Sequence, residues 1–174
     1  MERKQGKLWF MCANARAGKS TYADSWLRSP RVAKWDMDDK PQVFPRVVVS
    51  GDAIRKAIHG HSFLPEAESL VHAFMEISIR MFYEQGYEVL VDETSTSERS
   101  ISMYLKICED AQPIFIDTPI EVCKERAVKS GKEYLLDAID RIGSQFIELK
   151  KNWPEVRERV LKYVRMRREQ DKSV

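Results

Sequence analysis

The chain has 174 residues, 43% of them hydrophobic, which is enough to bury the core of one domain and excludes intrinsic disorder. Its 29 basic and 27 acidic residues leave a net charge of +2, which indicates no class of partner. No apolar run approaches the roughly 18 residues of a membrane span, and no secretory segment follows Met1. Three cysteines without CxxC spacing argue against a disulfide framework or zinc site. We therefore expect a cytoplasmic protein that binds no membrane.

Strand-like and helix-like segments alternate along the chain. An apolar run at 8–12 is typical of a strand buried on both faces, and a helix follows to about residue 27. Further strands are expected at 46–50, 89–91 and 113–117, and further helices at 52–59, 65–85, 98–109, 119–128, 133–150 and 154–170. This order predicts one α/β domain over 1–174 with a mostly parallel sheet of four to five strands and helices on both faces.

The long helix that begins at Pro65 carries apolar residues at helical spacing, which predicts its buried face. That predicted face comprises Ala67, Leu70, Val71, Phe74, Ile77 and Met81. We also expect Phe63, Phe74, Met81 and Phe82 in the core or at its edge. The polar connection at 30–45 contains three prolines and is longer than most connections, so it is interpreted as a functional loop or an insertion.

The C-terminal helix is the most basic part of the chain. Residues 151–174 carry eight basic and four acidic side chains, a net charge of +4. A basic helix can hold nucleic-acid phosphates, or its charges can form a solvated face of ion pairs. The sequence leaves both interpretations open.

A phosphate-binding loop follows the first strand. Residues 13–20 match G-x-x-x-x-G-K-[ST] except that Ala13 replaces the first glycine. Alanine resists a positive φ, but several variants of this loop accept it here, so we interpret Ala13 as tolerated. In such a loop Lys19 reaches the β- and γ-phosphates of ATP and the Ser20 hydroxyl binds Mg²⁺. The nucleotide-binding residues are therefore expected to be Asn14, Ala15, Arg16, Ala17, Gly18, Lys19, Ser20 and Thr21. Whether the Arg16 side chain contacts nucleotide or solvent stays open.

The rest of the sequence narrows the phosphate chemistry. A GTPase would carry an Asn-Lys-x-Asp guanine signature, which is absent from the sequence. Motor and AAA-type domains usually need a longer chain. A small-acceptor kinase fits the length of this one.

Asp52 and Arg55 follow the second strand with the spacing of one helical turn, which puts both on one face. Phosphoryl transfer to an alcohol needs a carboxylate to accept the proton and a cation to fix the acceptor. The carboxyl ends of parallel strands are where ligands bind, so these residues are candidates for both roles. The alternative is a helix cap at Asp52 and a surface side chain at Arg55.

Two later segments complete the candidate site. Asp92 ends the third strand, where it would hold Mg²⁺ through water or support Arg55. Cations around Gly131 suit a short lid over 126–134 that closes on ATP. In that lid Arg126 would neutralise charge on the transferring phosphoryl group.

With these four blocks the chain resembles the kinase domain of bacteriophage-type polynucleotide 5′-hydroxyl kinases. The blocks are the loop 13–21, Asp52-x-x-Arg55, Asp92-x-Thr94 and the lid arginine of 123–126. The resemblance implies that Asp52 is the general base, Arg55 contacts an acceptor phosphate, Asp92 and Thr94 serve the substrate, and Lys19, Ser20 and Arg126 serve ATP and Mg²⁺. If the protein is phage-encoded, it would act in the host cytoplasm.

Three departures from the family lie near the acceptor or the lid. Ser95 replaces an asparagine that commonly follows Asp-x-Thr, Ser130 replaces a second lid arginine, and the connection 30–45 is long. These departures bear on the identity of the substrate more than on the type of reaction.

The sequence thus predicts an ATP- and Mg²⁺-dependent kinase that phosphorylates a nucleic-acid hydroxyl, most simply the 5′-OH end of DNA or RNA. Three alternatives remain: a kinase of hydroxymethylated pyrimidines within DNA, a kinase of nucleosides or sugars, and a non-catalytic ATP-binding switch.

Overall fold

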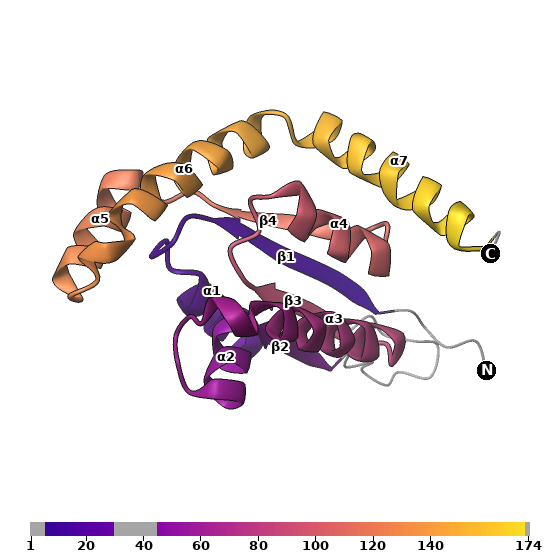
Figure 1. Ribbon diagram of the computed structural model, residues 1–174, viewed down its shortest axis with the longest axis horizontal. Coiled ribbons are helices and arrows are strands. Elements are labelled where there is room, and N and C mark those ends of the chain that lie inside the picture. The colour runs from indigo at the N-terminus through magenta and orange to yellow at the C-terminus, as the bar shows by residue number, and fades with distance from the viewer. Residues whose placement is uncertain (1–5, 30–44, 173–174) are drawn as a thin grey trace. The chain divides into compact units, whose positions relative to one another are not determined.

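The computed structural model describes residues 6–29 and 45–172 (Figure 1). All of the long connection except Pro45 lies outside the described residues. Within those residues no helix has an apolar stretch long enough to cross a membrane.

The strands form one four-stranded sheet in the order β2-β3-β1-β4. Their bounds are β1 (Lys7–Ala13), β2 (Arg46–Ser50), β3 (Glu88–Asp92) and β4 (Gln112–Ile116). All four strands are parallel and are flanked by helices, so the predicted fold class is confirmed. β2 pairs with β3 in a register that sets Val48 beside Leu90 and Ser50 beside Asp92. The last residues of these two strands are therefore neighbours.

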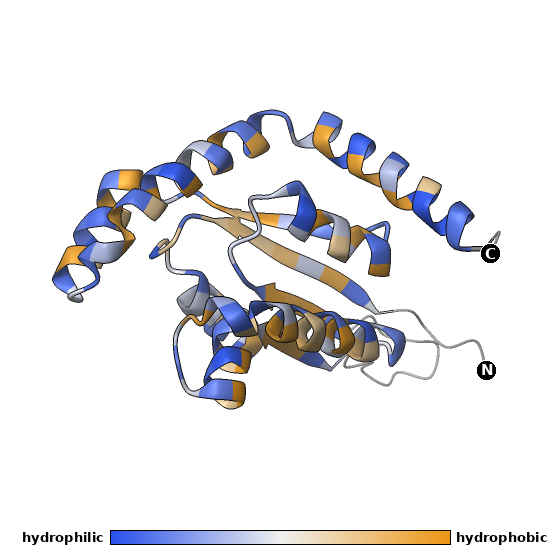
Figure 2. Ribbon diagram, viewed as in Figure 1, coloured by the Kyte–Doolittle hydropathy of each residue, from blue (hydrophilic) through white to orange (hydrophobic). Residues whose placement is uncertain are grey.

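Helices occupy the connections close to where the sequence predicts them. The α-helices are α1 (Lys19–Arg28), α2 (Gly51–His59), α3 (Glu68–Glu84), α4 (Glu98–Ile107), α5 (Ile120–Lys129), α6 (Leu136–Lys151) and α7 (Trp153–Lys172). Short 3₁₀ turns, η1 (Pro65–Ala67) and η2 (Glu133–Leu135), precede α3 and α6. In Figure 2 the helices carry apolar residues at intervals between hydrophilic ones, as expected for elements buried on one side.

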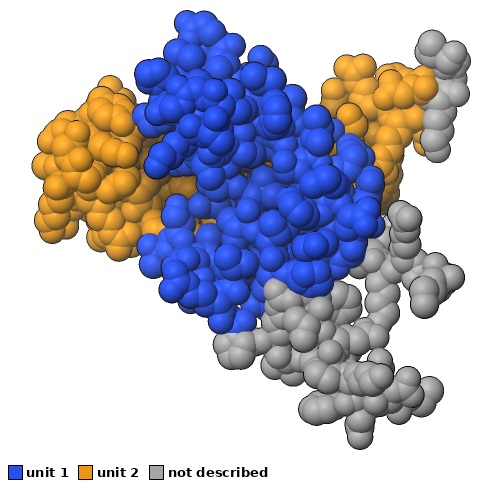
Figure 3. Space-filling view, turned by 90° about the horizontal axis from the view of Figure 1, so that it is seen from below, with its two compact units in different colours: residues 1–9, 20–92 blue, residues 10–19, 93–174 orange. Residues whose placement is uncertain are grey.

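The chain divides into two compact units (Figure 3). The first comprises 1–9 and 20–92, and the second comprises 10–19 and 93–174. One of the boundaries along the chain falls between Lys19 and Ser20.

In the first unit α3 packs on β2 and β3 through a face that overlaps the predicted one at Val71. The buried residues of α3 are Val71, Met75, Ile79 and Tyr83. Of the predicted face, Leu70, Phe74, Ile77 and Met81 are instead 47–64% exposed. Phe63 is 62% exposed as well, so its expected place in the core, and those of Phe74 and Met81, are wrong. Phe82 is half-buried with its ring centroid 5.3 Å from that of Tyr87.

In the second unit an aromatic cluster joins the sheet to the C-terminal helices. The ring of Phe10 stacks on Tyr104 at a centroid distance of 4.8 Å and meets the edge of Trp153 at 5.9 Å. Trp153 also contacts Phe115 of β4. The start of α7 is thereby fixed on the same core that holds α4.

Gly6 lies where the chain enters β1 and allows a close approach to the turn after α3. A Cβ at Gly6 would lie 2.2 Å from the Tyr87 carbonyl oxygen and 2.8 Å from that of Tyr83. Both are backbone atoms, so the strand itself must move to relieve the overlap. We predict that Gly6→Ala lowers the free energy of unfolding by about 1–3 kcal/mol in a urea titration. Lys7→Ala, at the exposed neighbouring position, should change it by less than about 0.5 kcal/mol.

Candidate active site

The phosphate-binding loop begins on unstrained backbone. Ala13 is the last residue of β1 and is fully buried, and its φ is not positive. The positive φ values occur at Gly18, at +96°, and at Arg16, at +63°. Alanine is therefore tolerated at position 13 without strain, and Arg16 is the non-glycine residue that adopts the left-handed conformation in the described chain.

The Asn14 side chain holds the loop in shape. Its Oδ1 accepts a hydrogen bond from the Ala15 N–H at 2.7 Å, and its Nδ2 donates to the Ile139 carbonyl of α6 at 2.9 Å. The Lys19 ammonium donates to the Asn14 carbonyl at 3.0 Å across the loop. A Cβ at Gly143 would lie 2.9 Å from Asn14 Nδ2, so a glycine allows α6 to pass this close.

The loop rests on an apolar cluster of the second unit. This cluster comprises Ala13, Ala17, Cys123, Ala127 and Ile139, all buried. It gives the loop a dry support formed by α5 and α6. The buried packing of Ala13 and Ala17 on α5 and α6 thus supports the loop on one side.

The predicted lid arginine contacts the loop. Arg126, in the last turn of α5, donates from Nη1 to the Arg16 carbonyl at 3.2 Å. Arg16 in turn donates from Nη2 to the Ser130 hydroxyl at 2.9 Å. The structure therefore brings Arg126 and the loop together, and its role in a lid stays a prediction.

In the first unit Ser20 contacts the carboxylate at the end of β3. The Ser20 hydroxyl donates to Asp92 Oδ2 at 3.0 Å, and Asp92 is only 9% exposed. This contact favours the metal-side alternative for Asp92. The other alternative, support of Arg55, stays a prediction as well.

Asp52 and Arg55 lie on one face of α2, and Glu68 of α3 completes the group. Arg55 Nη1 donates to Asp52 Oδ1 at 2.9 Å, while its Nε and Nη2 donate to the two oxygens of Glu68 at 2.8 Å each. The Arg55 side chain is 8% exposed and that of Asp52 is 85% exposed. The bidentate bond to Glu68 thus fixes the buried Arg55 guanidinium, which in turn holds the accessible carboxylate of Asp52.

Glu68 is the site residue that the sequence analysis missed. Hydrogen bonding to Arg55 holds the pKa of the Glu68 carboxyl below its ordinary value. Its signal in the sequence was weak, because an acid in the first turn of a helix is common. Only the packing of α3 on α2 identifies its partner.

Thr94 and Thr21 have fewer contacts that bear on a role in the site. In the described ranges, the hydrogen bond of Thr94 runs from its N–H to Glu93 Oε1 at 3.3 Å. Thr21 is exposed on α1. The assignment of Thr94 to substrate binding stays a prediction.

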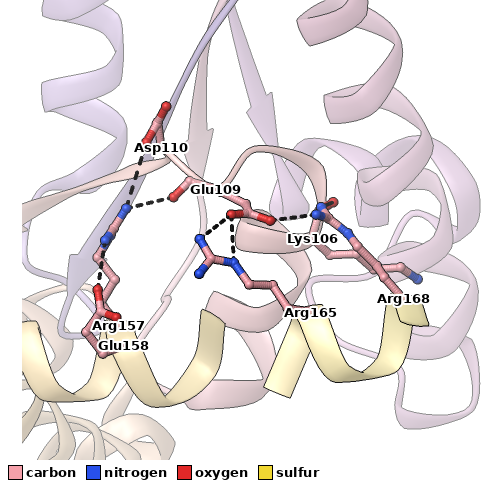
Figure 4. A network of polar contacts seen from close by, with 7 residues as sticks. All are labelled: Lys106, Glu109, Asp110, Arg157, Glu158, Arg165 and Arg168. Atoms are coloured by element: carbon pink, nitrogen blue, oxygen red, sulfur yellow. Dashed lines mark hydrogen bonds and ion pairs between the residues drawn. The ribbon is translucent and has the colours of Figure 1, made fainter. Parts of the chain in front are cut away.

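Arginines of α7 contact Glu109, which lies just after α4, and Glu98, the first residue of α4. Figure 4 shows the contacts to Glu109. Arg165 and Arg168 both bind the Glu109 carboxylate, at 2.7 and 2.6 Å. Arg157 donates to the Glu109 carbonyl, and Arg159 pairs with Glu98. These arginines therefore follow the ion-pair interpretation of the basic helix.

The Glu68–Arg55 ion pair should make the free energy of unfolding depend on pH in the acid range. Because the folded pKa of Glu68 lies below its ordinary value of 4.5, the pair contributes fully above that pH and is lost as the pH falls below it. At pH 7 we expect Glu68→Gln to lower the free energy of unfolding by about 2 kcal/mol. The difference from the parent protein should shrink between about pH 5 and pH 3.

Glu76→Gln is the matched control, because Glu76 lies on the same helix in an exposed pair with Arg80. It should cost about 0.5 kcal/mol or less. Equal effects of the two substitutions at pH 7 would contradict the special role of the Glu68 pair.

Comparisons with known proteins agree with this geometry. The profile of the AAA domain family matches residues 8–170, so the expectation that an AAA-type domain needs a longer chain is wrong here. A search of curated proteins found no match. A chain in the structure of the Pnkp1/Rnl/Hen1 RNA repair complex is similar with a TM-score of 0.68 and 20% identity. That alignment covers 86% of this chain and 46% of that one, so this chain spans less than half of its length.

A second similar structure is the Mycobacterium tuberculosis APS kinase CysC in complex with AMPPNP and APS, with a TM-score of 0.54 and 21% identity. It is matched over 81% of this chain and 76% of its own. At these identities the likeness shows the fold alone, a parallel sheet flanked by helices. The match over almost the whole sequence shows that this chain belongs to the AAA domain family.

Proposed function

We propose that the protein is an ATP- and Mg²⁺-dependent kinase that phosphorylates a hydroxyl of a nucleic acid, most simply the 5′-OH end of DNA or RNA. The observation that carries the proposal is the position of Asp52. It follows Ser50, the register neighbour of Asp92, and Asp92 accepts a hydrogen bond from Ser20 of the loop motif. An accessible carboxylate beside the expected Mg²⁺ site is what transfer to an alcohol requires.

In the proposed reaction the acceptor oxygen bonds to the γ-phosphorus as the bond from that phosphorus to the β–γ bridging oxygen breaks. The hydroxyl proton passes to the Asp52 carboxylate, and ADP leaves. Arg55 keeps Asp52 in place, because its Nε, Nη1 and Nη2 all donate to carboxylates. Lys19 and Arg126 would neutralise the charge that develops on the phosphoryl group.

Ser20 and Asp92 fit the Mg²⁺ that such a reaction uses. Their oxygens lie 3.0 Å apart, and hydroxyl and carboxylate oxygens are ligands that Mg²⁺ prefers. In the parts of the chain that the structure describes, no three acidic, histidine or cysteine side chains gather as a metal cage. Mg²⁺ would therefore complete its shell with water and nucleotide phosphates.

The acceptor is the least constrained part of the proposal. The similarity to a chain of an RNA repair complex supports a nucleic-acid hydroxyl. The ion pairs of α7 remove part of the support that a basic helix would give. A small-molecule kinase is the second candidate, supported by the similarity to the Mycobacterium tuberculosis APS kinase.

Labelled-ATP transfer to a panel of acceptors tests this choice. The panel contains 5′-hydroxyl oligonucleotides of DNA and RNA, duplexes with hydroxymethylated pyrimidines, free nucleosides and APS. We expect label on the 5′-hydroxyl oligonucleotides. Label on nucleosides or APS alone would overturn the nucleic-acid assignment and leave the kinase assignment intact.

Asp52→Asn tests the proposed base. Loss of the proton acceptor should lower the transfer rate about 10²- to 10⁴-fold while ATP binding is retained. Glu66→Gln is the matched control, because Glu66 is an exposed acid in the 3₁₀ turn η1, which lies between α2, the helix of Asp52, and α3. Its transfer rate should equal that of the parent protein. An unchanged rate in Asp52→Asn, with ATP bound, would favour a non-catalytic switch or a different base.

A further inference from the structure

Arg16 occupies a backbone conformation that favours glycine. Its φ of +63° lies in the left-handed region, where side chains other than those of Asn and Asp are uncommon. Gly18, two residues on, has a φ of +96° and shows the residue type that such backbone favours. A long cationic side chain at position 16 therefore adds no fit to the loop backbone, and its role must lie in the guanidinium.

The guanidinium of Arg16 is held at the loop with part of its hydrogen-bonding capacity unused. Nη2 donates to the Ser130 hydroxyl at 2.9 Å, and that hydroxyl donates to the Arg126 carbonyl at 2.8 Å. The Nε atom is buried and has no hydrogen-bond partner among the described residues. A buried donor without an acceptor is costly unless a ligand supplies one.

A second guanidinium lies on the same loop. Arg126 Nη1 bonds to the Arg16 carbonyl and lies 3.7 Å from the point where a Gly18 Cβ would be. Within residues 6–29 and 45–172, neither Arg16 nor Arg126 forms an ion pair with an acid. Two like charges held beside an array of backbone N–H groups without a counter-anion form a site for a multiply charged anion.

We propose that the Arg16 guanidinium binds the terminal phosphate of ATP, exchanging its hydrogen bond to Ser130 for one to a phosphate oxygen. The proposal rests on the proposed ATP binding and deepens it. The backbone N–H groups of the loop enclose the inner phosphates. The Arg16 side chain instead leaves the loop toward the end of α5, where the predicted lid arginine lies, and so reaches the outer end of the polyphosphate. Ser130 is its resting partner.

Arg16→Gly is a sharp test because glycine suits the backbone at this position. Binding of ATP and of ADP, each with Mg²⁺, is measured by calorimetry alongside the thermal unfolding temperature. We expect ATP affinity to fall about ten- to a hundredfold and ADP affinity to change less than about twofold. The unfolding temperature should stay equal or rise, because glycine adopts a positive φ without strain.

Ser130→Ala is the matched control for the resting hydrogen bond. It removes the partner and leaves the guanidinium, so ATP affinity should be unchanged or higher. If Ser130→Ala weakens ATP as much as Arg16→Gly does, Arg16 acts by fixing α5, and the proposal is overturned. Equal losses of ATP and ADP in Arg16→Gly would also overturn it.

The proposed ATP binding and the role of Arg16 can be tested separately. A parent protein that binds no ATP would remove the proposed function and this inference together. A parent protein that binds ATP, with an Arg16→Gly variant of equal affinity, would remove the role of Arg16 alone.

Discussion

The hydrogen bond between Ser20 and Asp92 is the contact on which the rest of the proposed chemistry depends. It joins the start of α1, directly after Lys19, to the end of β3. The parallel register then sets the end of β2 beside β3, and the chain passes within two residues from Ser50 to Asp52. The Ser20–Asp92 hydrogen bond and the register of β2 with β3 together relate the expected metal site to the proposed base, Asp52. Close packing favours this arrangement on the β3 side, where Val89, Leu90 and Val91 are fully buried.

The strand order of the fold and the position of α3 were predictable to different degrees. Short apolar runs followed by helix patterns identify a parallel sheet because crossover connections demand one. The inward face of α3 was not predictable, since apolar residues lie on two sides of that helix. One stripe includes Leu70 and Phe74, and the buried one includes Val71 and Met75. Helical periodicity fits both stripes, and only packing against β2 and β3 chooses between them.

Local spacing predicted those parts of the candidate site that lie within one turn or one loop. Asp52 and Arg55 are three residues apart, and their contact follows from helix geometry. Glu68 and the Arg16–Ser130 pair join segments 13 and 114 residues apart, so no local pattern could identify them. The consensus spacing located the loop, but it left the role of Arg16 open, because a one-dimensional motif does not say which residue takes a positive φ.

The approach of α6 to the loop gives the fold a mechanical property. At Gly143 there is no room for a side chain, because a Cβ would lie 2.7 Å from Ile120 and 2.9 Å from the Asn14 amide. The same amide is bonded to the Ile139 carbonyl one turn earlier. A translation or rotation of α6 must therefore move the Asn14 side chain or break its hydrogen bond to Ile139. The shape of the phosphate-binding loop and the position of α6, more than a hundred residues away in the sequence, therefore depend on each other through Asn14.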